Sequence, residues 1–162
     1  MDSLDAPAQA PTPCTAAGTE SDHDPCVSRD AALVLALAGT AMPFTHTAED
    51  QAETWLRTLS MHGNVGLVLQ ELGVEERPLV SRALPATESV GTPPVDDVVE
   101  QVARCATEFA IARGADCMGT ADLLFALFDV HGRTMDRALY MHGLERGDVF
   151  AQLAGAGRPL PA

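Results

Sequence analysis

The sequence predicts an all-α fold made of two pseudo-repeats of about four helices each. Two His-Gly pairs, at 62–63 and 131–132, lie 69 residues apart, and two helix-ending glycines, Gly73 and Gly143, lie 70 apart. A repeat at a fixed period is the signature of a duplicated helical unit. Composition agrees, because hydrophobic residues make up 46% of the chain and aromatic residues only 4%, so that Ala, Leu and Val must build the core.

The first copy is predicted at about residues 28–83. Its first helix runs from Ser28, a suitable N-cap, to Met42, and Pro43 ends it. The other predicted helices of this copy cover 48–61, 65–72 and 75–83. Gly63 and Gly73 separate these segments, as expected of helix-terminating glycines.

The second copy is predicted at 95–154, after a Pro- and Gly-containing linker at 84–94. Thr120 is expected to be the N-cap of its second helix. Its four predicted helices cover 95–113, 120–128, 134–142 and 145–153. Together the copies give one helical domain at 26–154, between a disordered tail at 1–25 and a flexible tail at 155–162.

The charge of the chain limits its partners. The net charge of −13 argues against nucleic acid and against anionic membrane surfaces, and favours basic partners. The residues 1–25 lack the features of a signal peptide, which predicts a cytoplasmic protein. None of the four cysteines forms a Cys-x-x-Cys pair, and Cys105 and Cys117 are expected to be small core residues rather than part of a disulfide scaffold.

Residues 103–152 resemble one repeat of the Clp N-terminal domain, the substrate- and adaptor-binding domain of ClpC/ClpA-type unfoldases. The resemblance lies in a long helix leading to Met118-Gly119-Thr120, the apolar helix that follows, and a last helix ending at Gly143. The first copy follows the same plan with less similarity, and together the copies cover about 125 residues. The resemblance implies a double-repeat Clp N-like helical fold.

In some members of that family, the Glu of a Gly-Thr-Glu-His motif helps to hold a phosphorylated arginine. Here the corresponding residue of the second copy is Ala121, and that of the first copy is Glu53 or Ala52, depending on the register. We therefore expect at least one phosphoarginine site to be lost. The chain also lacks lysine and a Gly-x-x-x-x-Gly-Lys-Ser/Thr loop, which excludes ATP hydrolysis by the mechanism of the family's ATPase modules.

The sequence contains only weak indications of metal binding or catalysis. No two histidines have the His-x-x-x-His spacing, and His62 and His131 are expected to be turn residues. The sequence therefore assigns no catalytic residue, no metal site and no cofactor. The residues expected to bind a ligand or peptide are Glu53, Gly119, Thr120 and Asp122.

The resulting hypothesis is a stand-alone, non-catalytic module that binds a protein or peptide. Its partner is expected to be a component or client of a Clp protease system, for which it acts as adaptor, client-binding factor or decoy. The alternative is a small helical enzyme or ligand-binding protein of a biosynthetic pathway, with a small molecule held between the repeats.

Overall fold

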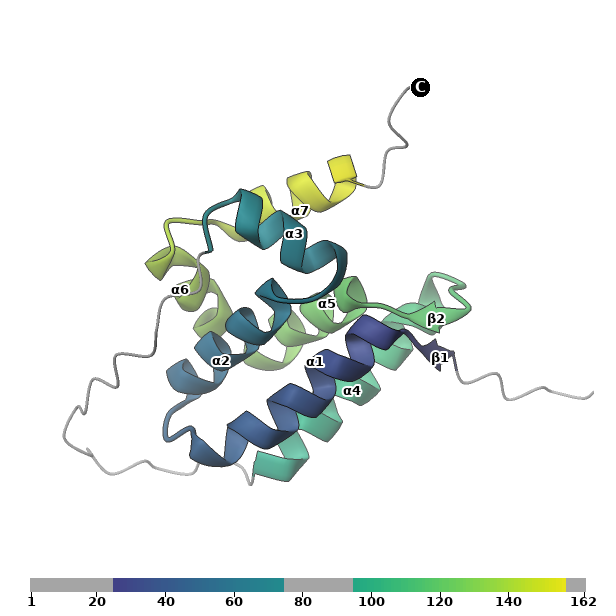
Figure 1. Cartoon of the computed structure of the whole chain (residues 1–162), viewed down its shortest axis with the longest axis horizontal. Coiled ribbons are helices and arrows are strands. Elements are labelled where there is room, and N and C mark those ends of the chain that lie inside the picture. Colours follow the sequence, from purple (N-terminus) through teal and green to yellow (C-terminus); the bar gives the residue numbers. More distant parts are fainter. Residues whose placement is uncertain (1–24, 75–94, 157–162) are drawn as a thin grey trace, which may run out of the picture.

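The computed structural model describes residues 25–74 and 95–156. These residues form a mostly helical protein, as the sequence predicts (Figure 1). The elements in chain order are β1 (Cys26–Val27), α1 (Arg29–Ala41), the 3-10 helix η1 (Met42–Phe44), α2 (Ala48–Ser60), α3 (Gly63–Glu71), α4 (Val95–Ala112), β2 (Cys117–Met118), α5 (Thr120–His131), α6 (Arg133–Met141) and α7 (Arg146–Ala156). The predicted helix at 75–83, the linker at 84–94 and nearly all of the two predicted tails lie outside the described residues.

The first two helices begin where their capping residues predict. The Ser28 side chain accepts a hydrogen bond from the Ala31 amide at 3.3 Å, and the Thr47 side chain accepts one from the Asp50 amide at 3.1 Å. Each bond satisfies an amide that has no partner within its helix. The expected cap at Ser28 is therefore confirmed.

Several expected helix ends differ from the structure. Helix α7 continues past Leu153 to Ala156, so the first two residues of the predicted flexible tail at 155–162 are helical. Gly63 is the first residue of α3 and has a φ of 68°, whereas the predicted helix began at residue 65. The N-cap of α5 is Gly119, and Thr120 is the first helical residue. Helix α5 continues past Phe128 to His131, because no helix-breaking residue occurs before Gly132, where φ is 46°.

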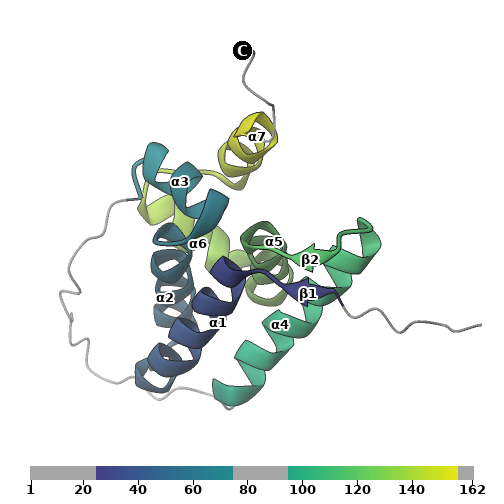
Figure 2. The same cartoon turned by 45° about the vertical axis from the view of Figure 1, so that its right-hand side comes forward.

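The helices pack across the two halves of the chain. Helices α1 and α4 run side by side, and the turned view keeps them adjacent (Figure 2). Helix α2 packs on α6, while α3 packs on α5 and α7. Each half thus covers the core of the other half.

The core has a repeated pattern. Helices α2 and α5 each bury three large apolar residues completely, at positions i, i+1 and i+4: Trp55, Leu56 and Leu59 in α2, and Leu123, Leu124 and Leu127 in α5. Leu69 of α3 and Leu139 of α6 are also fully buried. Burial of such side chains contributes about 1.5–3 kcal/mol each, so these helices supply much of the stability.

Strands β1 and β2 form a two-residue parallel pair, in which Cys26 is opposite Cys117 and Val27 is opposite Met118. No sequence pattern predicts this pair. It joins the beginning of the described chain to the segment before α5 (Figure 1). The pair places a cluster of polar contacts at the start of α5.

Candidate functional site

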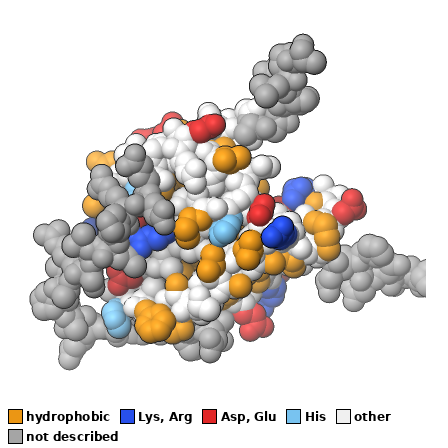
Figure 3. All heavy atoms as spheres, viewed as in Figure 1, with side chains coloured by type: hydrophobic (Ala, Val, Ile, Leu, Met, Phe, Trp, Pro, Cys, Tyr) orange, Lys and Arg blue, Asp and Glu red, His pale blue; other side chains and the backbone are white. Residues whose placement is uncertain are grey.

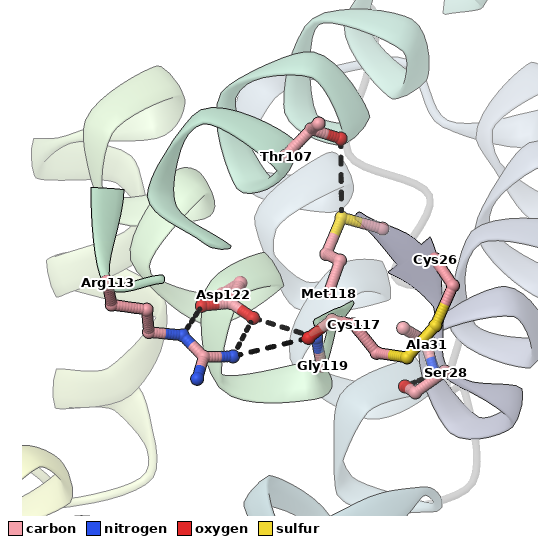
Figure 4. A network of polar contacts seen from close by, with 9 residues as sticks. All are labelled: Cys26, Ser28, Ala31, Thr107, Arg113, Cys117, Met118, Gly119 and Asp122. Atoms are coloured by element: carbon pink, nitrogen blue, oxygen red, sulfur yellow. Dashed lines mark hydrogen bonds and ion pairs between the residues drawn. A yellow bond between two sulfur atoms is a disulfide. The ribbon is translucent and has the colours of Figure 1, made fainter. Parts of the chain in front are cut away.

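The start of α5 is organised around a buried carboxylate. Asp122, which is 1% exposed, accepts a hydrogen bond from the Gly119 amide at 2.7 Å (Figure 4). The Arg113 guanidinium, from just beyond α4, donates to both carboxylate oxygens at 2.7 and 2.6 Å. Asp122 therefore satisfies a helix-end amide and binds a guanidinium through two hydrogen bonds.

This network involves two of the four expected binding residues, Gly119 and Asp122, and Thr120 lies between them in sequence. Gly119, Thr120 and Asp122 are the N-cap, the first helical residue and the third helical residue of α5. The carboxylate of Asp122 is already paired, however, and its hydrogen bond raises the pKa of Arg113. An incoming cation would have to displace a guanidinium of the protein itself.

The fourth expected residue, Glu53, belongs to a different contact. Its two carboxylate oxygens lie 3.0 and 3.1 Å from Nε2 of His142, the residue that follows α6. The His142 side chain is 13% exposed and that of Glu53 is 37% exposed. Glu53 thus joins α2 to the end of α6, rather than standing free in solvent as an isolated helix residue.

A disulfide between Cys26 and Cys117 crosslinks β1 to β2 (Figure 4). The expectation that Cys117 is a small core residue is therefore wrong. Cys105 packs partly buried against the core, as expected, and its thiol contacts Asp129 at 3.6 Å. Burial, followed by the charge of Asp129, raises the pKa of the Cys105 thiol.

Thr120 packs against the turn between α2 and α3. A Cβ at Gly63 would approach its Oγ1 to 2.8 Å, which shows how closely the turn and Thr120 pack. Beside this turn is a hollow of about 330 Å³. Its lining combines residues of α1, α2 and α3, among them Asp30, Ser60, His62, Asn64 and Gln70.

A second, shallower hollow of about 570 Å³ lies between α6 and α7. On its wall, Arg146 donates two hydrogen bonds of 2.9 Å to Asp136, and its guanidinium stacks over the Phe128 ring at 4.3 Å. Both hollows are lined by residues of one half of the chain. Neither is the groove between the repeats that the alternative function would use.

The two turn histidines differ in environment. His62 is the N-cap of α3, but its side chain makes no capping hydrogen bond. His131 ends α5 with its Nε2 buried and without a partner, and this burial lowers its pKa. Among the described residues, no three His, Cys, Asp or Glu side chains gather as a metal site would require.

Sequence reasoning missed Arg113, His142 and the disulfide partner Cys26. Each lies far in sequence from its partner or on another element: nine residues separate Arg113 from Asp122, and 89 separate His142 from Glu53. The signal available was indirect, since Cys26 and Cys117 each stand just before a helix start.

No protein-family model, curated protein or solved structure matches the chain. No helix of the described segments has the length and apolar character needed to cross a membrane.

Proposed function

We propose that the protein is a non-catalytic binding module of the Clp N-terminal type, which binds a protein or peptide of a Clp protease system. The observation that carries the proposal is the outer face of α1. This helix turns alanines and one valine, Ala31, Val34 and Ala38, toward the core, and leaves Leu33 and Leu37 40% and 39% exposed.

An exposed apolar helix face of this kind favours the binding of a partner. A helix that is apolar on all sides is normally buried on all sides. In addition, Phe44 of η1, at the end of α1, is 79% exposed. Figure 3 shows apolar side chains following the front of α1 down to the turn after it. Exposed apolar side chains that gather along one helix in this way are typical of protein interaction sites.

The Clp-like architecture is supported by the packing of the two halves. If the halves are related units, α2 corresponds to α5 and α3 corresponds to α6. The packing of α2 on α6 is then equivalent to the packing of α5 on α3. The buried triplets beginning at Trp55 and Leu123 have the same spacing. In that register Glu53 corresponds to Ala121, so Glu53, rather than Ala52, takes the place of the family's glutamate.

Phosphoarginine is a poor candidate ligand. The second copy has Ala121 in place of the glutamate, the neighbouring Asp122 is bound to Arg113, and Glu53 is bound to His142. The loss of one charge-assisted hydrogen bond costs about 1.5–3 kcal/mol, which is roughly tenfold or more in affinity. We expect calorimetry with free phosphoarginine to show weak binding or one site only, abolished in Glu53→Ala.

The partner is tested by affinity capture from the host lysate, followed by mass spectrometry. We expect Clp subunits or clients among the captured proteins, and loss of this capture in a Leu33→Glu/Leu37→Glu variant. Leu67→Glu is the matched control, because Leu67 is 62% exposed on α3 rather than α1. Capture that is unchanged in the α1 variant, or that contains no Clp component, contradicts the proposal.

A second candidate function is small-molecule binding in the hollow beside the α2–α3 turn. The hollow is favoured by its polar lining, which includes His62, Asn64 and Asp30. Native mass spectrometry of the purified protein tests it. A retained metabolite that is lost in His62→Ala supports this function, and protein of unmodified mass in every preparation contradicts it.

A further inference from the structure

The Cys26–Cys117 disulfide lies at the surface. Cys26 is exposed, and Cys117 is half-buried. Disulfides that solvent can reach are typically the labile ones, whereas fully buried disulfides resist exchange. A dithiol can therefore approach the Cys26 sulfur without unfolding the protein.

Among the residues that the structure describes, few other contacts hold β1 in place. The strand has two residues, both exposed, and its flanking hydrogen bonds are Cys26 N–H to the Asp116 carbonyl and Ser28 N–H to the Met118 carbonyl, each 2.9 Å. A strand pair of this length is not stable by itself in water. The disulfide is thus the main link between β1 and β2.

The two sides of the link differ in how well they are anchored. On the β2 side, Met118 is 1% exposed, and its sulfur contacts the Thr107 hydroxyl at 3.7 Å. The Arg113 guanidinium also reaches the Cys117 carbonyl at 3.5 Å (Figure 4). Breaking the disulfide therefore leaves β2 in place and releases β1.

From this geometry we propose that Cys26 and Cys117 form a reversible thiol–disulfide exchange site for a dithiol, small or protein-borne, which controls the attachment of β1 and of the Ser28 cap to the segment before α5. This proposal does not rest on the proposed function.

The exchange is balanced by the dithiol. One of its thiolates attacks Sγ of Cys26, and the sulfur–sulfur bond breaks with its electron pair going to Cys117, which takes up a proton. The second thiol of the reductant then attacks the mixed disulfide and releases Cys26 as a thiol. The protein gains two electrons and two protons, and the dithiol becomes a disulfide.

The structural effect reaches α1 through Ser28. This residue follows β1, caps α1 through its side chain, and donates its amide to Met118. Release of β1 removes the last of these bonds and frees the cap. Helix α1 itself stays in place, because Ala31, Val34 and Ala38 are completely buried.

The test uses the full chain carrying Cys14→Ser and Cys105→Ser, so that the pair is the only source of thiols. The protein is equilibrated with mixtures of reduced and oxidised dithiothreitol under native conditions. Alkylation counted by mass spectrometry reports the thiols, and hydrogen exchange reports the peptide covering 25–34. We expect both thiols to appear together, and exchange in that peptide to rise at least about tenfold on reduction while α4 and α5 stay protected.

The control protein carries a third substitution, Cys26→Ser. We expect hydrogen exchange in its 25–34 peptide to be fast in every mixture of reduced and oxidised dithiothreitol. The proposal is overturned if Cys26 and Cys117 are not linked in the oxidised protein, if the dithiol reduces them only in denaturant, or if reduction raises exchange equally throughout the chain. The last two results identify a structural crosslink instead of an exchange site.

Discussion

At the scale of single residues, the most constrained side chain is Asp122. It is buried, and its hydrogen bonds are charge-assisted, from the Gly119 amide and from two nitrogens of Arg113. A buried carboxylate that lost these partners would remain desolvated without compensation. Asp122, which the sequence predicted to bind a ligand, therefore stabilises the start of α5 instead.

Substitution of either partner tests how much the Asp122–Arg113 contact contributes to stability. Asp122→Ala removes a helix cap and a guanidinium pair, and we expect it to lower the free energy of unfolding by about 2–4 kcal/mol. Arg113→Ala should cost about 1–2 kcal/mol, because the arginine is half-exposed and its loss admits water. Urea denaturation measures both.

The double variant provides the control. Since the two side chains act on each other, Asp122→Ala/Arg113→Ala should cost less than the two single losses together. Strictly additive losses would show that the ion pair contributes nothing of its own.

His131 leads to a pH prediction. Its pKa lies below the ordinary 6.5 because the ring is buried, whereas the unfolded chain keeps the ordinary value. Below about pH 6.5 the unfolded state binds more protons than the folded state, so stability falls as the pH decreases toward the folded pKa. Wild-type protein should therefore lose stability between pH 7 and pH 5 more steeply than His131→Gln.

Thermal melts at several pH values test this difference. His46→Gln is the matched control for the loss of one histidine, because His46 is exposed. Parallel pH curves for wild type and His131→Gln would contradict the assignment.

At the scale of helices and strands, the sequence predicts local features well and long-range ones poorly. Capping residues and glycines place α1, α2 and α4 within a residue or two of their observed ends. The N-cap of α5 was misassigned, because the capping carboxylate comes from Asp122 within the helix while the cap itself is a glycine. The strand pair and its disulfide join segments 91 residues apart, which no local pattern encodes.

The candidate site was predictable in the same partial way. The resemblance pointed to the segment 118–122, and Gly119, Thr120 and Asp122 lie at the start of α5. The partners that determine what these residues can bind come from other elements. Side-chain pairs such as Arg113 with Asp122 depend on how a turn folds back, and this is fixed by tertiary packing.

Close packing of α3 on α2 gives a prediction for two glycines. A Cβ at Gly66 would lie 2.9 Å from the carbonyl oxygens of Leu59 and Ser60, which are backbone atoms that cannot easily move. Gly66→Ala should therefore lower the free energy of unfolding by about 1–3 kcal/mol. Gly39, within α1, has nothing within 4 Å of its Cβ position, and Gly39→Ala should stabilise the protein by about 0.5–1 kcal/mol.

Chemical denaturation of the two variants compares them directly. The opposite signs are the essential result, because helix propensity alone would favour alanine at both positions. Stabilisation by Gly66→Ala would show that α3 does not approach α2 as closely as the structure has it.

At the scale of the whole molecule, the described helices of the two halves share one core, which their separation would expose. Helix α2 is covered by α6, α3 by α5 and α7, and α1 lies along α4. Neither half has a closed core of its own, and small helical units without one are not stable alone. The Glu53–His142 contact and the Cys26–Cys117 disulfide also each join one half to the other.

This arrangement predicts complementation between fragments. Fragments 1–84 and 85–162, made separately, should each give the circular dichroism of a largely unfolded chain and no cooperative melting, because each exposes the apolar surface that the other covers. Mixed under oxidising conditions, they should recover helical signal and a single cooperative transition, held together by the Cys26–Cys117 disulfide. A mixture with Cys26→Ser should recover less signal at the same dilute concentration, because association then depends on non-covalent packing alone. A cooperative transition in either fragment by itself would show that the halves fold independently, and that the interlocked packing of α2 with α6 and of α3 with α5 is not what stabilises the fold.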